Sequence, residues 1–139
     1  MAGWLSDSRL DADALLAEVS SHECGGEVLF LGTVRRSSED GDIQGIEYSA
    51  YREMAEAELG RIVAEARERW PVARIALRHR LGYVPVGEAS IAIAVACPHR
   101  AEAYEASRYL IEETKKRVPI WKKERFASGA ARWVEAAHA

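Results

Sequence analysis

Residues 90–97, with the sequence SIAIAVAC, place the tightest constraint on how this chain can fold. Side chains along an extended segment alternate between two faces, and here both faces are apolar. Isoleucine, valine and cysteine form one face, and three alanines form the other. A strand that is apolar on both faces belongs in the middle of a covered sheet, and its alanine face would let a helix pack closely. We therefore predict a central strand here.

Three segments show helical patterns. A short helix over 14–19 follows Asp11, a residue type that caps helix N-termini. Residues 51–70 carry apolar side chains on one face and end before Pro71, which cannot continue a helix. The last long helix is predicted to begin at 98–100, the sequence PHR. Its predicted inner stripe comprises Tyr104, Ser107, Leu110, Ile111 and Thr114.

Shorter segments alternate as strands do, and polar or glycine-rich stretches separate them. Residues 35–41 are predicted to form a mobile loop and 81–88 a turn-rich connector. Because helices and strands mix without strict alternation, the fold class is predicted as α+β. A chain of 139 residues is most simply one domain, so a single domain over 1–139 is expected. The predicted strands are 27–31, 43–51, 74–80, 90–97, 120–126 and 132–135.

Charge and composition exclude several classes of protein. The chain has 19 Lys and Arg against 22 Asp and Glu, which disfavours nucleic-acid binding. Charged residues make up 29% and apolar residues 48%, a balance typical of globular chains. No apolar run reaches the roughly 20 residues that span a bilayer, and no signal-peptide pattern is present, so a cytoplasmic location without membrane association is expected. Cys24 and Cys97 lie far apart, fit no metal spacing and are expected to be reduced thiols.

Residues 115–125, the sequence KKRVPIWKKER, contain six cationic residues and one acidic residue. The rest of the chain holds 13 basic and 21 acidic residues. A local excess of positive charge of this size indicates a site that holds an anion. In its middle, Val118-Pro119 must end any arriving helix, because proline lacks an amide hydrogen and disfavours a helical residue before it. This corner therefore separates two pairs of lysines.

Lys115 and Lys122 are the candidates for chemistry in this segment. A lysine that is partly desolvated beside other cations has a lowered pKa, so it can act as an acid, a base or a nucleophile near neutrality. Lys116, Arg117 and Lys123 are predicted to form a solvated rim. The favourable interaction of cations with a helix C-terminus explains the residues before the corner, but it does not explain those beyond it.

Three other positions could bind an anion or take part in chemistry. His99 and Arg100 lie where a strand ends and a helix begins, so free amides, an imidazole and a guanidinium would meet there. Alternatively, His99 caps the helix and Arg100 is solvated. Arg35 follows the first long strand, where a solvated edge is the simpler interpretation. His79 shares a strand face with aliphatic residues and is predicted to be a core histidine. No P-loop, nucleophile-elbow or zinc-protease motif is present, and no histidine has a partner at metal spacing.

Several short motifs occur together in the order of one family. The sequence VPIWKKE at 118–124 is highly specific, and HRA at 99–101 begins sixteen residues before Lys115. The other matching motifs are FLGTVR at 30–35, YSAYREMA at 48–55, HRLG at 79–82 and GE at 87–88. On these motifs the chain resembles the large, catalytic subunits of molybdopterin synthase, the MoaE family, over about 27–135. The first 26 residues match loosely, and Ala136-Ala137 stand where some members carry a further basic residue.

The resemblance implies a fold, an activity and partners. The fold would be an α/β hammerhead with an additional antiparallel β subdomain. Members of the family convert cyclic pyranopterin monophosphate, also called precursor Z, into molybdopterin by installing two dithiolene sulfurs. The sulfur arrives as a thiocarboxylate on the C-terminal Gly-Gly tail of a small ubiquitin-like subunit. A homodimer with one small subunit at each end, a heterotetramer overall, is expected, and no metal or redox cofactor is required.

The resemblance also assigns site residues. Lys115 and Lys122 would be catalytic and would contact the substrate, and Arg35, His99 and Arg100 would hold its phosphate and pterin. The last two are expected to come from the neighbouring protomer.

The charge pattern alone leaves two other classes of function open. One is a non-catalytic adaptor that binds a ubiquitin-like tail or an anionic ligand, and the other is an RNA- or nucleotide-binding module, which the acidic remainder of the chain disfavours.

Overall fold

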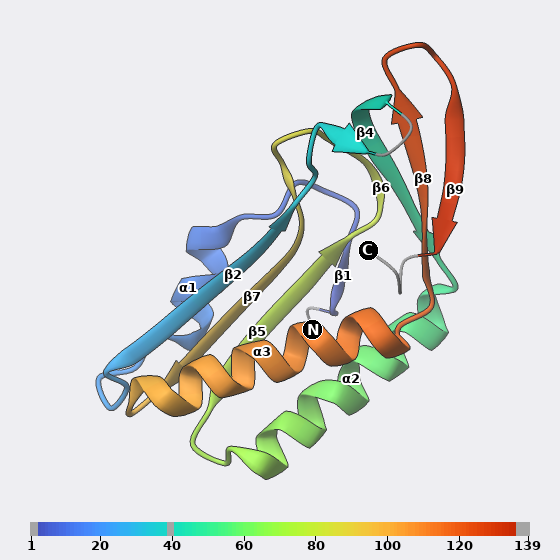
Figure 1. Ribbon diagram of the computed structural model, residues 1–139. Helices are drawn as coiled ribbons and strands as arrows, with labels where there is room; N and C mark the ends of the chain where they lie inside the picture. Colours follow the sequence, from blue (N-terminus) through green and yellow to red (C-terminus); the bar gives the residue numbers. More distant parts are fainter. Residues whose placement is uncertain (1–2, 39–40, 136–139) are drawn as a thin grey trace.

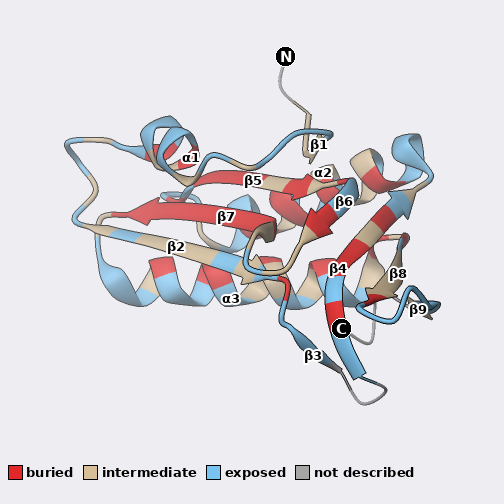
Figure 2. Cartoon of the chain, turned by 90° about the horizontal axis from the view of Figure 1, so that it is seen from above, coloured by how far each residue is buried: buried red, intermediate tan, exposed pale blue. Residues whose placement is uncertain are grey.

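The computed structural model describes residues 3–38 and 41–135, and its first sheet is built around the predicted central strand (Figure 1). The sheet has the order β1-β5-β7-β2. Strand β7 pairs antiparallel with both of its neighbours, and β1 pairs parallel with β5. Every residue from Ser90 to Cys97 is buried, so the prediction of a central strand is confirmed (Figure 2). The four strands are β1 (Leu5–Ser6), β5 (Arg74–Arg80), β7 (Ala89–Cys97) and β2 (Gly26–Thr33).

Helices cover both faces of this sheet, as the two apolar faces of β7 require. Helix α1 (Ala12–Val19), capped by the Asp11 side chain at Ala14 N, packs on the alanine face of β7. Helices α2 (Arg52–Arg69) and α3 (Arg100–Arg117) lie against the face with the larger side chains. The α+β class is confirmed, because the long strands of this sheet pair antiparallel and are not joined as parallel β-α-β units.

A second, antiparallel sheet stands beyond the C-terminal end of α3 (Figure 1). Strand β4 is at its centre. It pairs with β8 along one edge and, at separate positions, with β3 and β6 along the other edge. This sheet is the additional β subdomain that the family resemblance implies. Its strands are β3 (Ser37–Ser38), β4 (Gly41–Ala50), β6 (Gly82–Pro85), β8 (Ile120–Phe126) and β9 (Ala131–Glu135).

The corner at Val118-Pro119 connects α3, which packs on the first sheet, to β8 of the second sheet. Helix α3 ends at Arg117, and Val118 is extended, with φ −83° and ψ 126°. The Val118 amide still donates to Thr114 O at 3.1 Å, so the chain leaves the helix directly and enters β8 two residues later. The predicted break is confirmed, and its effect is to place Lys115 on a helix and Lys122 on a strand.

Three predictions about the fold are wrong in part. The connector at 81–88 contains β6, and the loop at 35–41 contains β3, because both segments pair with β4. Residues 39–40 of that loop, like Ala136-Ala137, lie outside the described residues. Tyr104 is 64% exposed, so it does not belong to the inner stripe of α3. That stripe is Ala103, Ala106, Ser107, Leu110 and Thr114, whose small members allow close contact with the sheet.

Candidate active site

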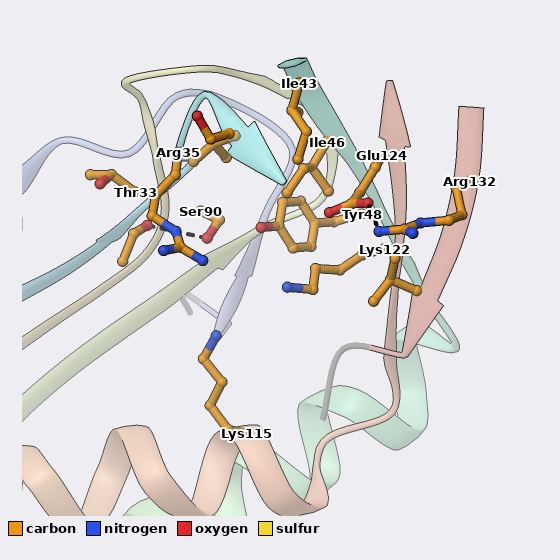
Figure 3. Close-up of a pocket in the computed structure, with 14 residues that line it drawn as sticks. Thr33, Arg35, Ile43, Ile46, Tyr48, Ser90, Lys115, Lys122, Glu124 and Arg132 are labelled. Carbon is orange, nitrogen blue, oxygen red and sulfur yellow. Dashed lines mark hydrogen bonds and ion pairs between the residues drawn. The ribbon is translucent and has the colours of Figure 1, made fainter. Parts of the chain in front are cut away.

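A pocket of ≈ 290 Å³ opens where the two sheets and the C-terminal end of α3 meet (Figure 3). Three of the predicted site residues line it: Arg35, Lys115 and Lys122. They come from three separate parts of the chain, namely the segment after β2, the last turn of α3 and strand β8. The fold therefore brings together cations that are far apart in sequence.

Lys115 reaches the pocket from the last turn of α3, and its ammonium points toward the gap between the sheets (Figure 3). The residue as a whole is exposed, but partial burial of its ammonium lowers its pKa, because a partly desolvated ammonium loses some of the stabilisation that water gives to its charge. Within residues 3–38 and 41–135, no carboxylate lies within ion-pair distance of it. Its charge is thus held without a neutralising partner from the described chain.

Lys122 faces the same space from β8. It pairs in register with Tyr48 on β4, so both side chains stand on one face of the second sheet. Burial lowers its pKa to about 8, and Lys115 and Arg35 add to this lowering, whereas Glu124 opposes it. At neutral pH an appreciable fraction of a lysine with this pKa is uncharged, whereas an ordinary lysine is almost fully protonated.

Arg35 is held at the pocket by the backbone around it. The preceding residue, Val34, is buried and donates its amide to Glu88 O at 3.0 Å, while its carbonyl accepts from Gly87 N at 2.9 Å. The Arg35 side chain is exposed and extends over the pocket (Figure 3). A solvated edge is therefore an incomplete description, since the guanidinium is available to an anion in the pocket.

Several polar side chains of the pocket were not singled out from the sequence, and four of them lie around Lys122 and the junction of the sheets. Glu124 stands two residues after Lys122 on β8 and forms a 2.7 Å ion pair with Arg132 of β9. Alternation along the predicted strand at 120–126 would have placed Glu124 beside Lys122. Tyr48 and Ser90 had no such signal, because their position depends on how the two sheets meet. All four line the pocket: Tyr48, Ser90, Glu124 and Arg132.

His79 is buried, as predicted, but it lies closer to the site than a plain core position would. Its ring makes an edge contact with Tyr48, with ring centroids 5.2 Å apart. Burial lowers its pKa to about 4; the hydrogen bond to Arg80 O opposes this lowering, and the charges of Lys115 and Lys122 add to it. The imidazole is therefore neutral near pH 7.

His99 and Arg100 are not in this pocket. They lie at the N-terminal end of α3, and the helical rise separates Arg100 from Lys115 by about 22 Å. Both are exposed, and His99 occupies the N-cap position of the helix but makes no side-chain cap hydrogen bond, so it caps the helix by backbone position only. The backbone of Gly26 packs so closely on Arg100 that a Cβ there would lie 2.9 Å from Arg100 Cα. This close approach explains why glycine opens β2.

Arg117 does not belong to a solvated rim. It donates to Glu58 at 2.7 Å, to Glu65 at 2.6 Å and to Glu113 at 3.2 Å, so it ties α3 to α2. Lys123 also has a partner, because its ammonium lies 5.3 Å from the centre of the Trp133 ring. Of the three residues predicted to form the rim, Lys116 alone is exposed as predicted, with a 3.5 Å contact to Glu113.

The pocket combines fixed positive charge with one lysine, Lys122, that can exchange a proton near neutrality. Such a site can bind a phosphate or carboxylate and stabilise negative charge that develops on it. Among the described residues there is no cluster of side chains that could hold a metal ion. Nor is any helix in the described ranges both long and apolar enough to cross a membrane.

Comparison with known proteins gives a consistent result. The family model described as "MoaE protein" matches residues 5–117. The molybdopterin synthase catalytic subunit of Bos taurus is 44% identical over 128 residues, which is 92% of this chain and 68% of the relative. The structure of molybdopterin synthase from Staphylococcus aureus superposes with a TM-score of 0.89 at 32% identity and covers 95% of this chain and 96% of that one.

A more distant structure shows the same fold. It is a complex of subunits 1 and 2 of molybdopterin-converting factor from Helicobacter pylori, 24% identical, with a TM-score of 0.76 and coverage of 95% of this chain and 88% of that one. Family model, curated relative and fold agree with the motifs that flank the pocket. The chain therefore belongs to the MoaE family of molybdopterin synthase catalytic subunits, enzymes of molybdenum cofactor biosynthesis.

Proposed function

We propose that this pocket transfers sulfur to cyclic pyranopterin monophosphate, precursor Z, to form the dithiolene of molybdopterin. The sulfur donor is the thiocarboxylated C-terminal glycine of a small ubiquitin-like subunit. The observation that carries the proposal is the meeting of Lys115, Lys122 and Arg35 in one pocket. A substrate phosphate and a thiocarboxylate are both anions, and this cluster offers them positive charge in a partly desolvated place.

The two lysines have different surroundings and are assigned different roles. Lys122, with a pKa of about 8, suits proton transfer to and from the pterin side chain at neutral pH. Lys115 projects from the opposite wall and is assigned to the carbonyl of the donor. After the sulfur has bonded to the pterin, it stabilises the oxyanion that forms when water attacks this carbonyl, and breakage of the carbon–sulfur bond then releases the tail as a carboxylate and leaves the sulfur on the pterin. Arg35, always charged, holds the phosphate at the open side.

The sulfur carrier is proposed to bind as an extended tail that enters the pocket. Two glycines can pass through a narrow opening that larger residues could not. The Helicobacter pylori relative was solved as a complex of two subunits, which supports an equivalent partner here. Two large and two small subunits would form the heterotetramer.

A second copy of this chain is proposed to complete the substrate site. His99 and Arg100 lie about 22 Å from Lys115 along α3, so they cannot reach the pocket of their own chain without unfolding the helix. Both are exposed at the helix N-terminus, where free amides and the helix dipole favour an anion. In a homodimer they would approach the pocket of the neighbouring chain.

Reconstitution tests the activity directly. The chain is mixed with a thiocarboxylated small subunit and the cyclic pterin, and dithiolene product is measured. Lys115→Ala and Lys122→Ala should each lower the rate by about 100-fold or more, because removal of one stabilising or proton-transferring group commonly has such effects. Lys116→Ala is the matched control, since this neighbouring lysine is exposed and outside the pocket, and it should keep the wild-type rate. Near-normal turnover by either pocket variant would remove that lysine from the mechanism. Failure of the wild type with verified components would favour the adaptor.

Mixing two inactive chains tests whether the site is shared. Arg100→Ala and Lys115→Ala chains, dissociated and reassembled together, would form hybrid dimers with one intact site. Random assembly predicts recovery of about a quarter of the wild-type activity. No recovery, or a monomer in sedimentation at micromolar concentration, would contradict the shared site.

A further inference from the structure

A second, smaller cavity adjoins the active-site pocket and shares four of its lining residues, Tyr48, Ser90, Lys115 and Lys122. Its volume is ≈ 30 Å³, enough for one water molecule. Apolar side chains form part of its wall, but the remainder is polar. The polar lining residues are Tyr48, His79, Ser90, Thr114, Lys115 and Lys122.

Thr114 supplies an unsatisfied hydroxyl to this cavity. The residue is 6% exposed, and its Oγ1 makes no hydrogen bond to any of the described residues. A buried hydroxyl without a partner is unfavourable, and valine would fill the same space without that penalty. Thr114 immediately precedes Lys115 on α3, so a molecule that binds this hydroxyl also lies near Lys115.

His79 supplies a hydrogen-bond acceptor of fixed orientation. Its Nδ1 lies 2.9 Å from Arg80 O. A carbonyl oxygen can only accept, so Nδ1 carries the hydrogen and Nε2 of the neutral ring keeps its lone pair. The ring is buried and held at its side by Tyr48, so this tautomer and orientation are maintained.

These groups offer the kinds of donors and acceptors that one water molecule can use. Water can donate to Thr114 Oγ1 and to His79 Nε2 and can accept from lysine ammonium groups. The charged and titratable groups that line the cavity are Lys115 of α3, Lys122 of β8, Tyr48 of β4 and His79 of β5. The adjoining larger pocket adds Glu124 of β8, Arg132 of β9 and Arg35 after β2.

We infer that this inner cavity holds a water molecule through which Thr114 and His79 position the ammonium groups of Lys115 and Lys122. This inference rests on the proposed function for its catalytic meaning, but the water itself can be tested without sulfur transfer. Thr114 and His79 are positioning residues, because they act on the reacting atoms through the lysines. Because they accept hydrogen bonds from the water, its oxygen is free to accept from the ammonium groups. This stabilises the charged form of the lysines and limits the lowering of their pKa values by burial.

Thr114→Val and Thr114→Ser form the deciding pair. Valine removes the hydroxyl at nearly constant shape, and serine keeps it. If the water is present, Thr114→Val should lower the pKa of Lys115 by about 0.5 to 1, seen by NMR titration of the lysine side chains, and Thr114→Ser should keep the wild-type titration. Thr114→Val should also lower the unfolding midpoint by about 2 °C. A raised midpoint with an unchanged titration would overturn the inference, because it would mean that the hydroxyl was simply unpaired.

His79 gives an independent arm. Gln places an amide near the position of Nε2, whereas Leu offers no acceptor. His79→Gln should retain most of the wild-type lysine titration, and His79→Leu should lower the pKa of the lysines. A high-resolution crystal structure of the wild type should show the water within hydrogen-bond distance of Thr114 Oγ1 and His79 Nε2. An empty cavity, with the Thr114 hydroxyl turned to the Leu110 carbonyl, would overturn the inference.

The two proposals fail in different ways. If wild-type chains make no dithiolene, the titrations and the crystal structure still decide whether the water is present. If wild-type chains turn over while Thr114→Val has the wild-type titration and pH profile, the positioning role is refuted and sulfur transfer stands.

Discussion

Lys115 and Arg117 are two residues apart on the same helix, yet their surroundings are opposite. Arg117 is bonded to three carboxylates, from Glu58, Glu65 and Glu113. Lys115 faces a pocket where no described carboxylate pairs with it, and burial lowers its pKa. Two residues turn a helix by about 200°, so neighbouring cations of one sequence run face opposite sides. The charge excess of the segment therefore divides into a stabilising part and a reactive part.

The comparison separates what holds the fold from what serves the reaction. Arg117 connects the C-terminal end of α3 to α2, and its charge is fully compensated. Lys115 and Lys122 repel each other and are partly desolvated, which lowers stability. Functional sites commonly keep such unfavourable arrangements because the same features supply reactivity.

Arg117→Met should produce the largest loss of stability. It leaves three carboxylates close together without their cation while it keeps much of the apolar stem. Because the ions are partly exposed, and therefore screened, we expect the unfolding midpoint to fall by about 5 °C rather than more. Arg108→Met is the matched control, since Arg108 pairs with Glu112 at 2.8 Å on the exposed surface of the same helix and should change the midpoint little. Equal effects of the two changes would break the comparison.

The Arg117 cluster should also make the stability of the fold depend on pH in the acid range. Hydrogen bonds from Arg117, and then from Tyr109, lower the pKa of Glu65 from its ordinary 4.5 to about 2. A carboxylate with a lowered folded-state pKa contributes stability that is present above pH 4.5 and is lost as the pH falls toward 2. Thermal unfolding across this window should therefore show a steeper loss for wild type than for Arg117→Met. Parallel curves would contradict the assignment.

Lys122→Met should raise the unfolding midpoint, the opposite of Arg117→Met, and by a smaller amount. The folded-state pKa of about 8 lies below the ordinary 10.5, so the unfolded chain binds more protons between these values. Wild-type stability should rise with pH through this window, and below pH 8 the full penalty of the buried charge applies. Methionine removes the penalty, so the variant should unfold about 3 °C higher at pH 7, although it should not turn over.

Lys123→Met provides the control for this gain. Lys123 stands on the other face of β8 and contacts the Trp133 ring, so its replacement removes a favourable contact and no buried charge. It should not stabilise the fold. If Lys122→Met failed to stabilise at pH 7, or if its advantage did not shrink as the pH approached 10.5, the lowered pKa of Lys122 would be refuted.

Local sequence patterns predicted the long strands of both sheets and missed the short ones, β1, β3 and β6. The strand at 90–97, the capped helix after Asp11 and the break at Val118-Pro119 depend on neighbours in the chain, so alternation, capping and proline stereochemistry were sufficient. Strands β3 and β6 exist because they pair with β4, and β1 because it pairs with β5. Those contacts are remote in sequence and leave no periodic signal in segments of two to four residues.

The site divides in the same way. Lys115, Lys122 and Arg35 could be chosen from charge and motif, and the structure brings them together. The partners of Arg117 could not be predicted from the sequence, because Glu58 and Glu65 lie on another helix. His79 was correctly predicted to be buried, but burial alone did not reveal that it adjoins both lysines. Placement of His99 and Arg100 in the pocket of a second chain stays a prediction.

The smallest effect tests whether Glu124 tunes Lys122. Its carboxylate opposes the lowering of the Lys122 pKa, so Glu124→Gln should move this pKa below about 8, by about 0.5. The limb of the pH–rate profile that depends on Lys122 should move to lower pH by the same amount. Glu47→Gln is the matched control, because Glu47 pairs with Arg125 on the other face of the second sheet and does not line the pocket. A shift for both variants would indicate a general loss of negative charge, and only a shift confined to Glu124→Gln assigns the tuning to the pocket.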